Sequence, residues 1–292
     1  MPKLFSLKKW YFDFVSEQED TCYIYFIELY LGPFRQCVSS LHLYRNDRRR
    51  FFFQQKDRSV QLSNVEALGN EAVLYIDFPE CCGMLHYRPA AAADLSHLNS
   101  NLIDRDFTGL RWFVPKPANH VHGELKLEFG VIKVIGKGYH DFVEIDILPS
   151  RLAIDRMYWG RVLANDWGAI FISLKKGSGK SVHLLVFWKK AQVYHIDDFF
   201  LEEYKGFLRL DFVVDGISAY LRLPKSMTLE SGFAITEGRE PNAALNLLYR
   251  FISGNPYERK FQTTGATVSN SEQSAGQAIF ERVDWCHNGK TA

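Results

Sequence analysis

Short strand-like runs separated by turn residues recur along most of this 292-residue chain. They are rich in β-branched and aromatic residues and are bounded by Gly, Asn, Asp and Pro, which is typical of antiparallel strands. Examples are 23–31, 40–45, 73–78, 121–130, 169–174, 182–188 and 278–285. A parallel sheet would require regular helices between the strands, and the sequence pattern lacks them. We therefore predict a mainly β protein built as a sandwich or barrel.

Helical patterns are few and short. Residues 241–252 begin with proline, carry apolar residues at three- and four-residue spacing and stop before a glycine, which predicts a helix. Asp197 and Asp198 are positioned to cap a helical turn that ends at Glu203. The alanine-rich stretch 88–101 is interpreted as a mobile loop with a helical turn, in the manner of a lid.

The length and the break in pattern near Pro149 and Ser150 predict two domains. We expect an N-terminal β domain at 1–150 and a C-terminal β domain at 151–292. Two β-rich halves of similar length also indicate a duplicated architecture. The small, polar stretch 263–276 is expected to be a long loop or connector.

The charge balance predicts neither a nucleic-acid partner nor steering to an anionic membrane, because 35 basic residues face 34 acidic ones. The basic run Asp47–Arg50 is interpreted as a solvated turn, since phosphate-binding surfaces usually combine many basic contacts. Aromatic residues make up 15% of the chain. They suit half-buried strands and also the walls of apolar ligand pockets.

The cysteines and the N-terminus predict a cytoplasmic protein. Five cysteines, without a metal-type C-x-x-C pair, fit a reduced intracellular setting. The opening residues lack a signal-peptide core, and polar residues interrupt every longer apolar run, so we expect no membrane span.

Two segments imitate functional motifs. KKGSGKS (175–181) lacks the first glycine of a phosphate-binding loop and precedes a strand, so we predict a hairpin turn. His120 and His122 have a metal-like spacing. They share the polar face of an alternating strand, however, and no third ligand is near in sequence, so we expect no metal site.

The segment GKGYHD (136–141) places three proton-carrying side chains beside an alternating strand. Alternation puts Tyr139, Asp141 and Val143 on one face and His140 on the other. Asp141 would then point to the apolar face, where desolvation favours a protonated carboxyl and makes it a candidate proton donor. The alternative is a carboxylate that ends the strand by accepting backbone N–H bonds.

The same segment resembles the signature of the carotenoid 1,2-hydratase (hydroxyneurosporene synthase-like) family, which has G-x-G-Y-x-D, a proline linker and an aromatic segment ending in arginine. Further stretches are similar to the family in the same order, so the resemblance spans most of the chain. The matching stretches are KKWYFDF (8–14), RWFVPKPANHVHGEL (111–125), GKGYHD (136–141), YWGR (158–161) and the glutamate-containing strand GQAIFERVDW (276–285).

The resemblance implies two tandem antiparallel lipocalin-like (calycin) β-barrels, with a ligand cavity near their contact. Family members hydrate or cyclise isoprenoids without a cofactor, and relatives carry out pericyclic cyclisations. In the family an aspartate protonates an alkene, and the matching residue here is Asp141. A hydrophobic small molecule is the expected ligand, and peripheral membrane contact would allow its uptake.

Beside Asp141, Tyr139 and His140 are the residues expected to orient the acid or relay its proton. Aromatic faces stabilise a passing cation. The residues expected to bind the substrate in this way are Tyr11, Trp112, Tyr158, Trp159 and Trp188.

The chain departs from the family after the aspartate. The family usually has a small or polar segment ending in glycine, whereas this chain continues with the bulky run 142–145. Three hypotheses therefore stand: a hydratase or cyclase that uses Asp141, a pericyclase, and a protein that binds a lipid or pigment without changing it.

Overall fold

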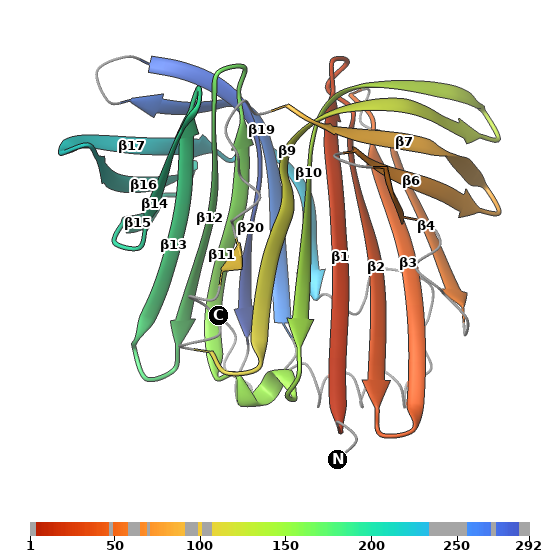
Figure 1. Cartoon of the computed structure of the whole chain (residues 1–292), viewed down its shortest axis with the longest axis horizontal. Helices are drawn as coiled ribbons and strands as arrows, with labels where there is room; N and C mark the ends of the chain where they lie inside the picture. The colour runs from red at the N-terminus through yellow and green to blue at the C-terminus, as the bar shows by residue number, and fades with distance from the viewer. Residues whose placement is uncertain are drawn as a thin grey trace. The chain divides into compact units, whose positions relative to one another are not determined.

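The computed structural model describes residues 4–46, 49–57, 65–68, 71–90, 99–100, 107–233, 256–269 and 273–285. The chain divides into two compact units, Met1–Ile147 and Leu148–Ala292. Each unit is formed around one curled antiparallel sheet of ten strands (Figure 1). The predicted mainly β, antiparallel fold class is confirmed.

The sheet of unit 1 has the order β4-β3-β2-β1-β10-β9-β7-β6-β5, and β8 pairs with β9. It curls so that β6 and β7 run across β1, β2 and β3 (Figure 1). Its strands are β1 (Phe5–Ser16), β2 (Thr21–Leu31), β3 (Phe34–Tyr44), β4 (Arg50–Asp57), β5 (Val65–Leu68), β6 (Glu71–Phe78), β7 (Cys81–Pro89), β8 (Asn99–Ser100), β9 (Leu110–Leu127) and β10 (Gly130–Ile145).

The sheet of unit 2 repeats this topology in the order β14-β13-β12-β11-β20-β19-β17-β16-β15, and β18 pairs with β19. The matching orders show that the two halves share a duplicated architecture. The strands are β11 (Ile154–Leu163), β12 (Trp167–Lys176), β13 (Ser181–Lys189), β14 (Gln192–Ile196), β15 (Phe200–Glu203), β16 (Phe207–Val214), β17 (Ile217–Pro224), β18 (Met227–Phe233), β19 (Pro256–Ser269) and β20 (Gln273–Trp285).

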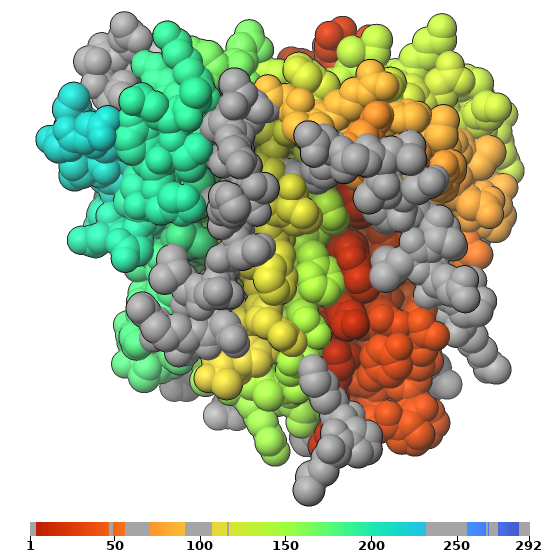
Figure 2. Space-filling model, viewed as in Figure 1, coloured from red at the N-terminus to blue at the C-terminus, as the bar shows by residue number. Residues whose placement is uncertain are grey.

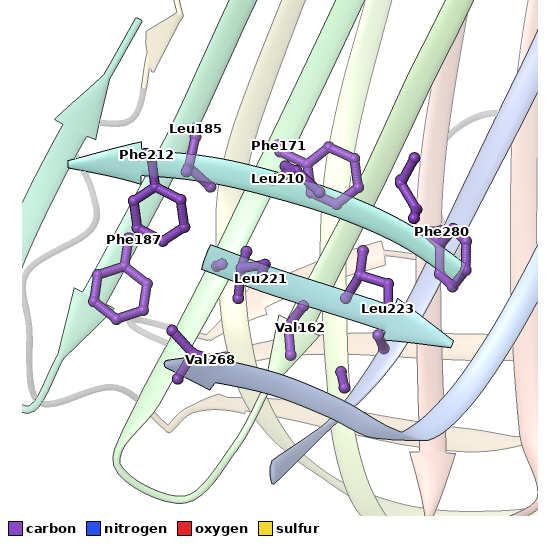
Figure 3. Packing of buried hydrophobic residues seen from close by; sticks show 14 of the residues in the cluster. Val162, Phe171, Leu185, Phe187, Leu210, Phe212, Leu221, Leu223, Val268 and Phe280 are labelled. Atoms are coloured by element: carbon purple, nitrogen blue, oxygen red, sulfur yellow. The ribbon is translucent and has the colours of Figure 1, made fainter. Parts of the chain in front are cut away.

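An apolar cluster fills the concave side of each sheet. In unit 1 it takes every second residue of the strands, for example Phe12 and Phe14 of β1 with Leu85 of β7. In unit 2 the cluster includes Phe171, Phe187, Leu210 and Phe280 (Figure 3). Because side chains alternate across a strand, the other residues of β1 and β11 point to the opposite face of their sheets.

Gly160 of β11 shows how tightly the core of unit 2 is filled. A Cβ atom at this position would lie 2.6 Å from the Phe171 ring and 2.7 Å from Phe280 Cβ. The two phenylalanines flank Gly160 in the sheet. They therefore occupy the volume that a side chain of β11 would fill.

Several expectations about connections can now be settled. Residues 176–180 form the predicted hairpin turn, closed by a 2.8 Å hydrogen bond from the Lys176 amide to the Lys180 carbonyl. The expected loop at 263–276 is wrong for the described part of this stretch, because residues 263–269 belong to β19, residues 273–276 belong to β20, and the two strands pair. The expected helical turn ending at Glu203 is also wrong, because β15 pairs there with β16.

Helix is scarce in the described residues, where one short 3-10 helix, η1 (Pro149–Arg151), follows β10. The helix predicted at 241–252 and the centre of the stretch 88–101 lie outside the described residues. Among the helices that can be described, none has the length and apolar character needed to cross a bilayer.

Candidate functional site

Polar aromatic and acidic side chains line the face of the unit 1 sheet that is opposite its apolar cluster. They occur at alternate positions of four strands that are neighbours in the sheet, and all are buried. We call this set, together with Trp112 of β9, the tyrosine face. Its members are Tyr11 and Asp13 on β1, Tyr23 and Tyr25 on β2, His42 and Tyr44 on β3, Tyr139 and Asp141 on β10, and Trp112.

Asp141 is held in place by two neutral donors. Its side chain is 4% exposed, and its Oδ2 atom accepts hydrogen bonds from Trp112 Nε1 and from the Tyr139 hydroxyl, both at 3.0 Å. Trp112 reaches it because the pairing of β10 with β9 shifts register between His140 and Phe142. The carboxyl group is therefore fixed in orientation although it is buried.

Tyrosine rings surround this carboxyl group. Tyr11 is the cross-strand partner of Asp141 and lies 6.1 Å from the Tyr139 ring and 5.3 Å from the Tyr25 ring, measured between centroids. The Lys9 ammonium lies 4.2 Å from the Tyr25 centroid. The ring of Tyr25 therefore already makes a cation–π contact within the protein.

Asp141 does not face the aliphatic core, contrary to expectation. The apolar cluster lies on the side of His140, which stacks on Phe12 with a centroid separation of 3.9 Å. His140 Nδ1 donates a 2.8 Å hydrogen bond to the Tyr11 carbonyl. Of the two predicted partners of Asp141, the structure brings Tyr139 to the carboxyl group and holds His140 on the other face.

Tyr158, a predicted substrate-binding residue, belongs to the apolar cluster of unit 2 instead. Its hydroxyl donates a 2.9 Å hydrogen bond to Glu203, which also pairs with Lys225 and Arg282. Burial and the hydrogen bond to Glu203 raise the pKa of Tyr158 to about 12. Tyr158 is therefore a neutral donor within an ion-pair network.

Trp159 and Trp188 lie on the opposite, also buried, face of the unit 2 sheet. The Trp188 indole covers Gly168, where a Cβ atom would lie 2.1 Å from the ring. Trp159 pairs across the strands with Glu281. We call this set the indole face; its members are Trp159 and Arg161 on β11, Ile170 and Ile172 on β12, Val186 and Trp188 on β13, Lys260 on β19 and Glu281 on β20.

The indole face contains a buried ion pair. Lys260 is 0% exposed, and its Nζ atom lies 3.1 Å from a Glu281 oxygen and 3.3 Å from a Glu258 oxygen. A buried charge has to be paired because desolvation is costly. Glu281 is the acid of the strand that resembles the closing strand of the hydratase family, and here it is paired with a cation.

Sequence reasoning found Tyr11, Trp112, Tyr139 and Asp141 but missed the rest of the tyrosine face. The signal was present as polar or aromatic residues two apart in otherwise apolar strands: Y-x-D (11–13), Y-x-Y (23–25), H-x-Y (42–44) and Y-x-D (139–141). Strands buried on both faces normally read as continuous apolar runs. Such a polar stripe therefore distinguishes this buried face from an ordinary apolar core.

A second group of titratable residues lies elsewhere on the unit 1 sheet. Glu71, His86 and His122 are half-buried, and their ligand atoms all lie within 4.8 Å of one another. The sequence places no third candidate ligand near His120 and His122, but the sheet brings Glu71 of β6 and His86 of β7 beside His122.

Comparisons with known proteins support the fold. No family model and no curated protein matches the sequence. Among solved structures, CghA matches with a TM-score of 0.68 at 11% identity, covering 98% of this chain and 90% of CghA. A protein of Nitrosomonas europaea described as an AttH matches with 0.62 at 10% identity, covering 96% of this chain and 93% of that one.

Kievitone hydratase from Nectria haematococca matches with a TM-score of 0.57 at 10% identity, covering 94% of this chain and 88% of the hydratase. CghA has also been solved with Sch210972. At these identities the likeness shows a shared calycin-like fold over nearly the whole chain.

Proposed function

We propose that the protein hydrates or cyclises a small hydrophobic alkene, with Asp141 as the general acid. The observation that carries this proposal is the geometry of Asp141: a buried carboxyl group whose Oδ2 atom accepts from Trp112 and Tyr139. An isoprenoid or other polyene is the substrate class that the sequence resemblance suggests. The name of the structurally similar kievitone hydratase agrees with this reaction class.

The two hydrogen bonds indicate which oxygen carries the proton. A protonated carboxyl group has one hydroxyl oxygen and one carbonyl oxygen, and the carbonyl oxygen is the better acceptor. Because Trp112 and Tyr139 both donate to Oδ2, we place the transferable proton on Oδ1. Trp112 and Tyr139 then hold the O–H group in a fixed direction before the substrate binds, which reduces the reorganisation needed during reaction.

The reaction balances without a cofactor. The π electrons of the alkene take the Oδ1 proton to form a C–H bond, which leaves a carbocation and the Asp141 carboxylate. In hydration, water adds to the cation and returns a proton to Asp141. In cyclisation, an internal π bond adds to the cation and a neighbouring C–H proton returns to the base. Asp141 is regenerated in both cases.

The tyrosine face suits the cationic intermediate. An aromatic ring within about 6 Å of a cation contributes about 0.5–2 kcal/mol, and more when water is excluded. Tyr11 and Tyr139 are buried and adjacent. Their faces can stabilise positive charge without supplying a nucleophile as strong as a carboxylate.

Glu281 is a poorer candidate for the acid, although it lies on the equivalent strand of unit 2. It pairs with Lys260, which is fully buried. Protonating Glu281 would remove a negative charge from beside this lysine, and a buried uncompensated charge is strongly unfavourable. Both donors to Asp141 described above are neutral, so its protonation leaves them uncharged.

The test is product analysis in labelled solvent. The protein is incubated with geranylgeraniol, squalene or lycopene in D₂O or in H₂¹⁸O, and the products are analysed by mass spectrometry. Hydration incorporates both deuterium and ¹⁸O, whereas cyclisation through a protonated alkene incorporates deuterium alone. Recovery of every probe unlabelled and unchanged would contradict the proposal for this substrate class.

Asp141→Asn is expected to lower turnover by about 10²- to 10⁴-fold, the usual contribution of a general acid. The amide keeps the shape of the side chain and still accepts hydrogen bonds through its oxygen. Asp77→Asn, at an exposed position of β6, makes the same chemical change elsewhere in unit 1 and is expected to leave turnover unchanged. Equal activity of the two variants would remove Asp141 from the mechanism.

A pericyclase is the second candidate, and the number of tyrosyl hydroxyl groups on the tyrosine face favours it. Hydroxyl donors can polarise a substrate carbonyl without transferring a proton. Such a reaction would survive Asp141→Asn and would incorporate neither label. A binding protein without activity would instead retain an unchanged ligand in both the parent protein and the variant.

A further inference from the structure

Two imidazoles and one carboxylate meet on the outer face of the unit 1 sheet, on three different strands. Glu71 begins β6, His86 lies on β7, and His122 lies on β9. His86 Nδ1 and Glu71 Oε1 are 2.9 Å apart, and the two imidazole rings stack with centroids 4.7 Å apart. The three side chains therefore converge on one small volume.

We propose that Glu71, His86 and His122 bind a divalent first-row transition metal ion, for which Zn²⁺ is the natural probe. The ligand atoms all lie within 4.8 Å of one another. Two ligands of a tetrahedral zinc ion, each about 2.0–2.2 Å from the metal, are about 3.3 Å apart. Small side-chain rotations bring the three atoms to that spacing, with the fourth position left to water.

The ligand types define the class of ion. Imidazole nitrogen suits zinc, copper, nickel and iron, whereas magnesium and calcium prefer sites built from oxygen alone. A set of two histidines and one carboxylate is thus expected to discriminate against Mg²⁺. The three protein ligands resemble open zinc sites, which keep a water molecule in the fourth position.

The backbone beneath the cluster holds the two histidines at a fixed separation. His86 and His122 are direct cross-strand partners in the β7–β9 pairing. Gly123, next to His122, approaches β7 so closely that a Cβ atom there would lie 2.0 Å from the Met84 carbonyl oxygen. The register cannot slip without disrupting this contact, so the site is largely formed before the metal arrives.

Arg88 competes with the metal ion for the Glu71 carboxylate. Its Nε atom donates a 3.0 Å hydrogen bond to the same Glu71 oxygen, and its side chain is 58% exposed. An exposed ion pair of this kind is weak. The guanidinium can turn into solvent when the cation binds, so Arg88 lowers the affinity without closing the site.

The site is open to ions from solvent. The side chains of His86 and Glu71 are 22% and 21% exposed. Side chains of the β6–β7 hairpin form part of the surface visible in Figure 2 (orange). Exposed Met84 and Tyr75 on the same hairpin agree with an accessible outer surface.

The experiment is calorimetric titration of the untagged, chelator-treated full-length protein with ZnCl₂ and, separately, MgCl₂. One Zn²⁺ per chain is expected to bind, and Mg²⁺ is expected to show no binding at the same concentrations. His86→Gln and His122→Gln are each expected to weaken zinc binding by about 100-fold or more, since even outer-shell partners of metal sites contribute about 10- to 100-fold. His120→Gln changes an exposed histidine of the same strand face and is expected to leave the affinity unchanged.

Arg88→Gln is expected to change the zinc affinity in the opposite direction to the histidine variants. Removing the competing charge is expected to tighten zinc binding by about three- to tenfold, whereas a merely structural role of the cluster predicts no such gain. Zinc should also raise the melting temperature of the parent protein but not of the His86→Gln/His122→Gln double variant. Circular dichroism establishes that each variant is folded.

Two results would overturn the proposal. One is unchanged 1:1 zinc binding by the folded double variant. The other is loss of binding in Cys82→Ser, which would assign the ion to the exposed thiol of β7. A Co²⁺ complex without thiolate charge-transfer absorption is the expected spectrum, and thiolate absorption would count against the site.

Discussion

Each unit places a buried carboxyl group on the strand that pairs with its first strand, and the two groups have different surroundings. In unit 1, Asp141 of β10 pairs with Tyr11 of β1; in unit 2, Glu281 of β20 pairs with Trp159 of β11. On its other side Asp141 receives the neutral indole N–H of Trp112, whereas Glu281 meets the Lys260 ammonium. One carboxyl group thus accepts hydrogen bonds from neutral side chains, and the other lies beside a buried ammonium group.

The neighbouring register positions show how one scaffold accommodates both arrangements. Phe12 follows Tyr11 and is flanked by Ile24 and His140. Gly160 follows Trp159, and the rings of its flanking residues fill the missing volume. The side-chain volume that the first strand of unit 2 lacks is supplied by its neighbouring strands, so the core is filled in both units, as close packing requires.

Lys260→Met is expected to have the largest effect on stability. The substitution leaves Glu281 buried beside an apolar side chain, and removing one partner of a buried ion pair costs about 3–5 kcal/mol of unfolding free energy. Urea unfolding followed by far-UV circular dichroism measures the loss. Combining it with Glu281→Leu should restore most of the stability, because an apolar pair of similar volume replaces the ions. A loss below about 1 kcal/mol in the single variant would show that the ion pair is not structural.

Gly160→Ala is expected to destabilise the protein by about 1–3 kcal/mol, the usual cost of overpacking a core. The added methyl group would lie 2.6 Å from the Phe171 ring unless that ring moves. Pairing it with Phe171→Leu, which makes room on β12, should recover part of the loss. Additive losses in the double variant would refute the idea that volume is exchanged between these strands. Urea midpoints at a constant unfolding slope give the comparison.

The sequence carried enough information for the fold but not for all connections. Alternating runs predicted the strands, since β-branched and aromatic residues suit a half-buried surface. The small, polar residues of the stretch 263–276 predict a loop, yet Ala266 of β19 pairs with Gly276 of β20 and Val268 pairs with Ser274. Cross-strand pairing overrides weak local preference there, as it does in β15.

The candidate sites, too, depend on contacts between strands that no single segment of the sequence predicts. Residues two apart on one strand share a face, so Tyr139 and Asp141 could be grouped from sequence. The hydrogen bond from Trp112 depends on a register shift between β9 and β10, which local sequence does not encode. The cluster of Glu71, His86 and His122 depends on the order of three strands. Both are properties of pairing rather than of any single segment.

Tyr139→Phe tests whether the donors around Asp141 position the acid. Removing one of the two hydrogen bonds to Oδ2 is expected to lower kcat by about tenfold, or about 1.4 kcal/mol, with little change in KM. Trp112→Phe should have a similar effect. A structural role alone would lower stability and leave the pH dependence of kcat unchanged, whereas loss of a donor to the carboxyl group shifts that profile. Tyr44→Phe, on the same face but hydrogen-bonded to Tyr23, is the comparison variant.

Glu203→Gln is expected to have the smallest effect and one that depends on pH. In the register position next to the Tyr11–Asp141 pair, unit 1 has the aromatic pair Trp10 and Phe142. In the position next to the Trp159–Glu281 pair, unit 2 has Tyr158 and Arg282, which both bind Glu203. Burial alone would raise the pKa of Glu203, but hydrogen bonds from Lys225 and Tyr158 outweigh burial and hold that pKa below its ordinary value.

A lowered folded-state pKa means that Glu203 stabilises the protein fully above its unfolded pKa of about 4.3, and that this stabilisation is lost as the pH falls through the folded-state value. Glu203→Gln should therefore cost about 1 kcal/mol at pH 7, a figure reduced by partial solvent screening. The difference from the parent protein should shrink below about pH 4. Trp10→Phe in unit 1 changes no titrating group, so its cost should be independent of pH over the same range. Parallel pH dependence of the two variants would show that the ion network of unit 2 is not the source of acid sensitivity.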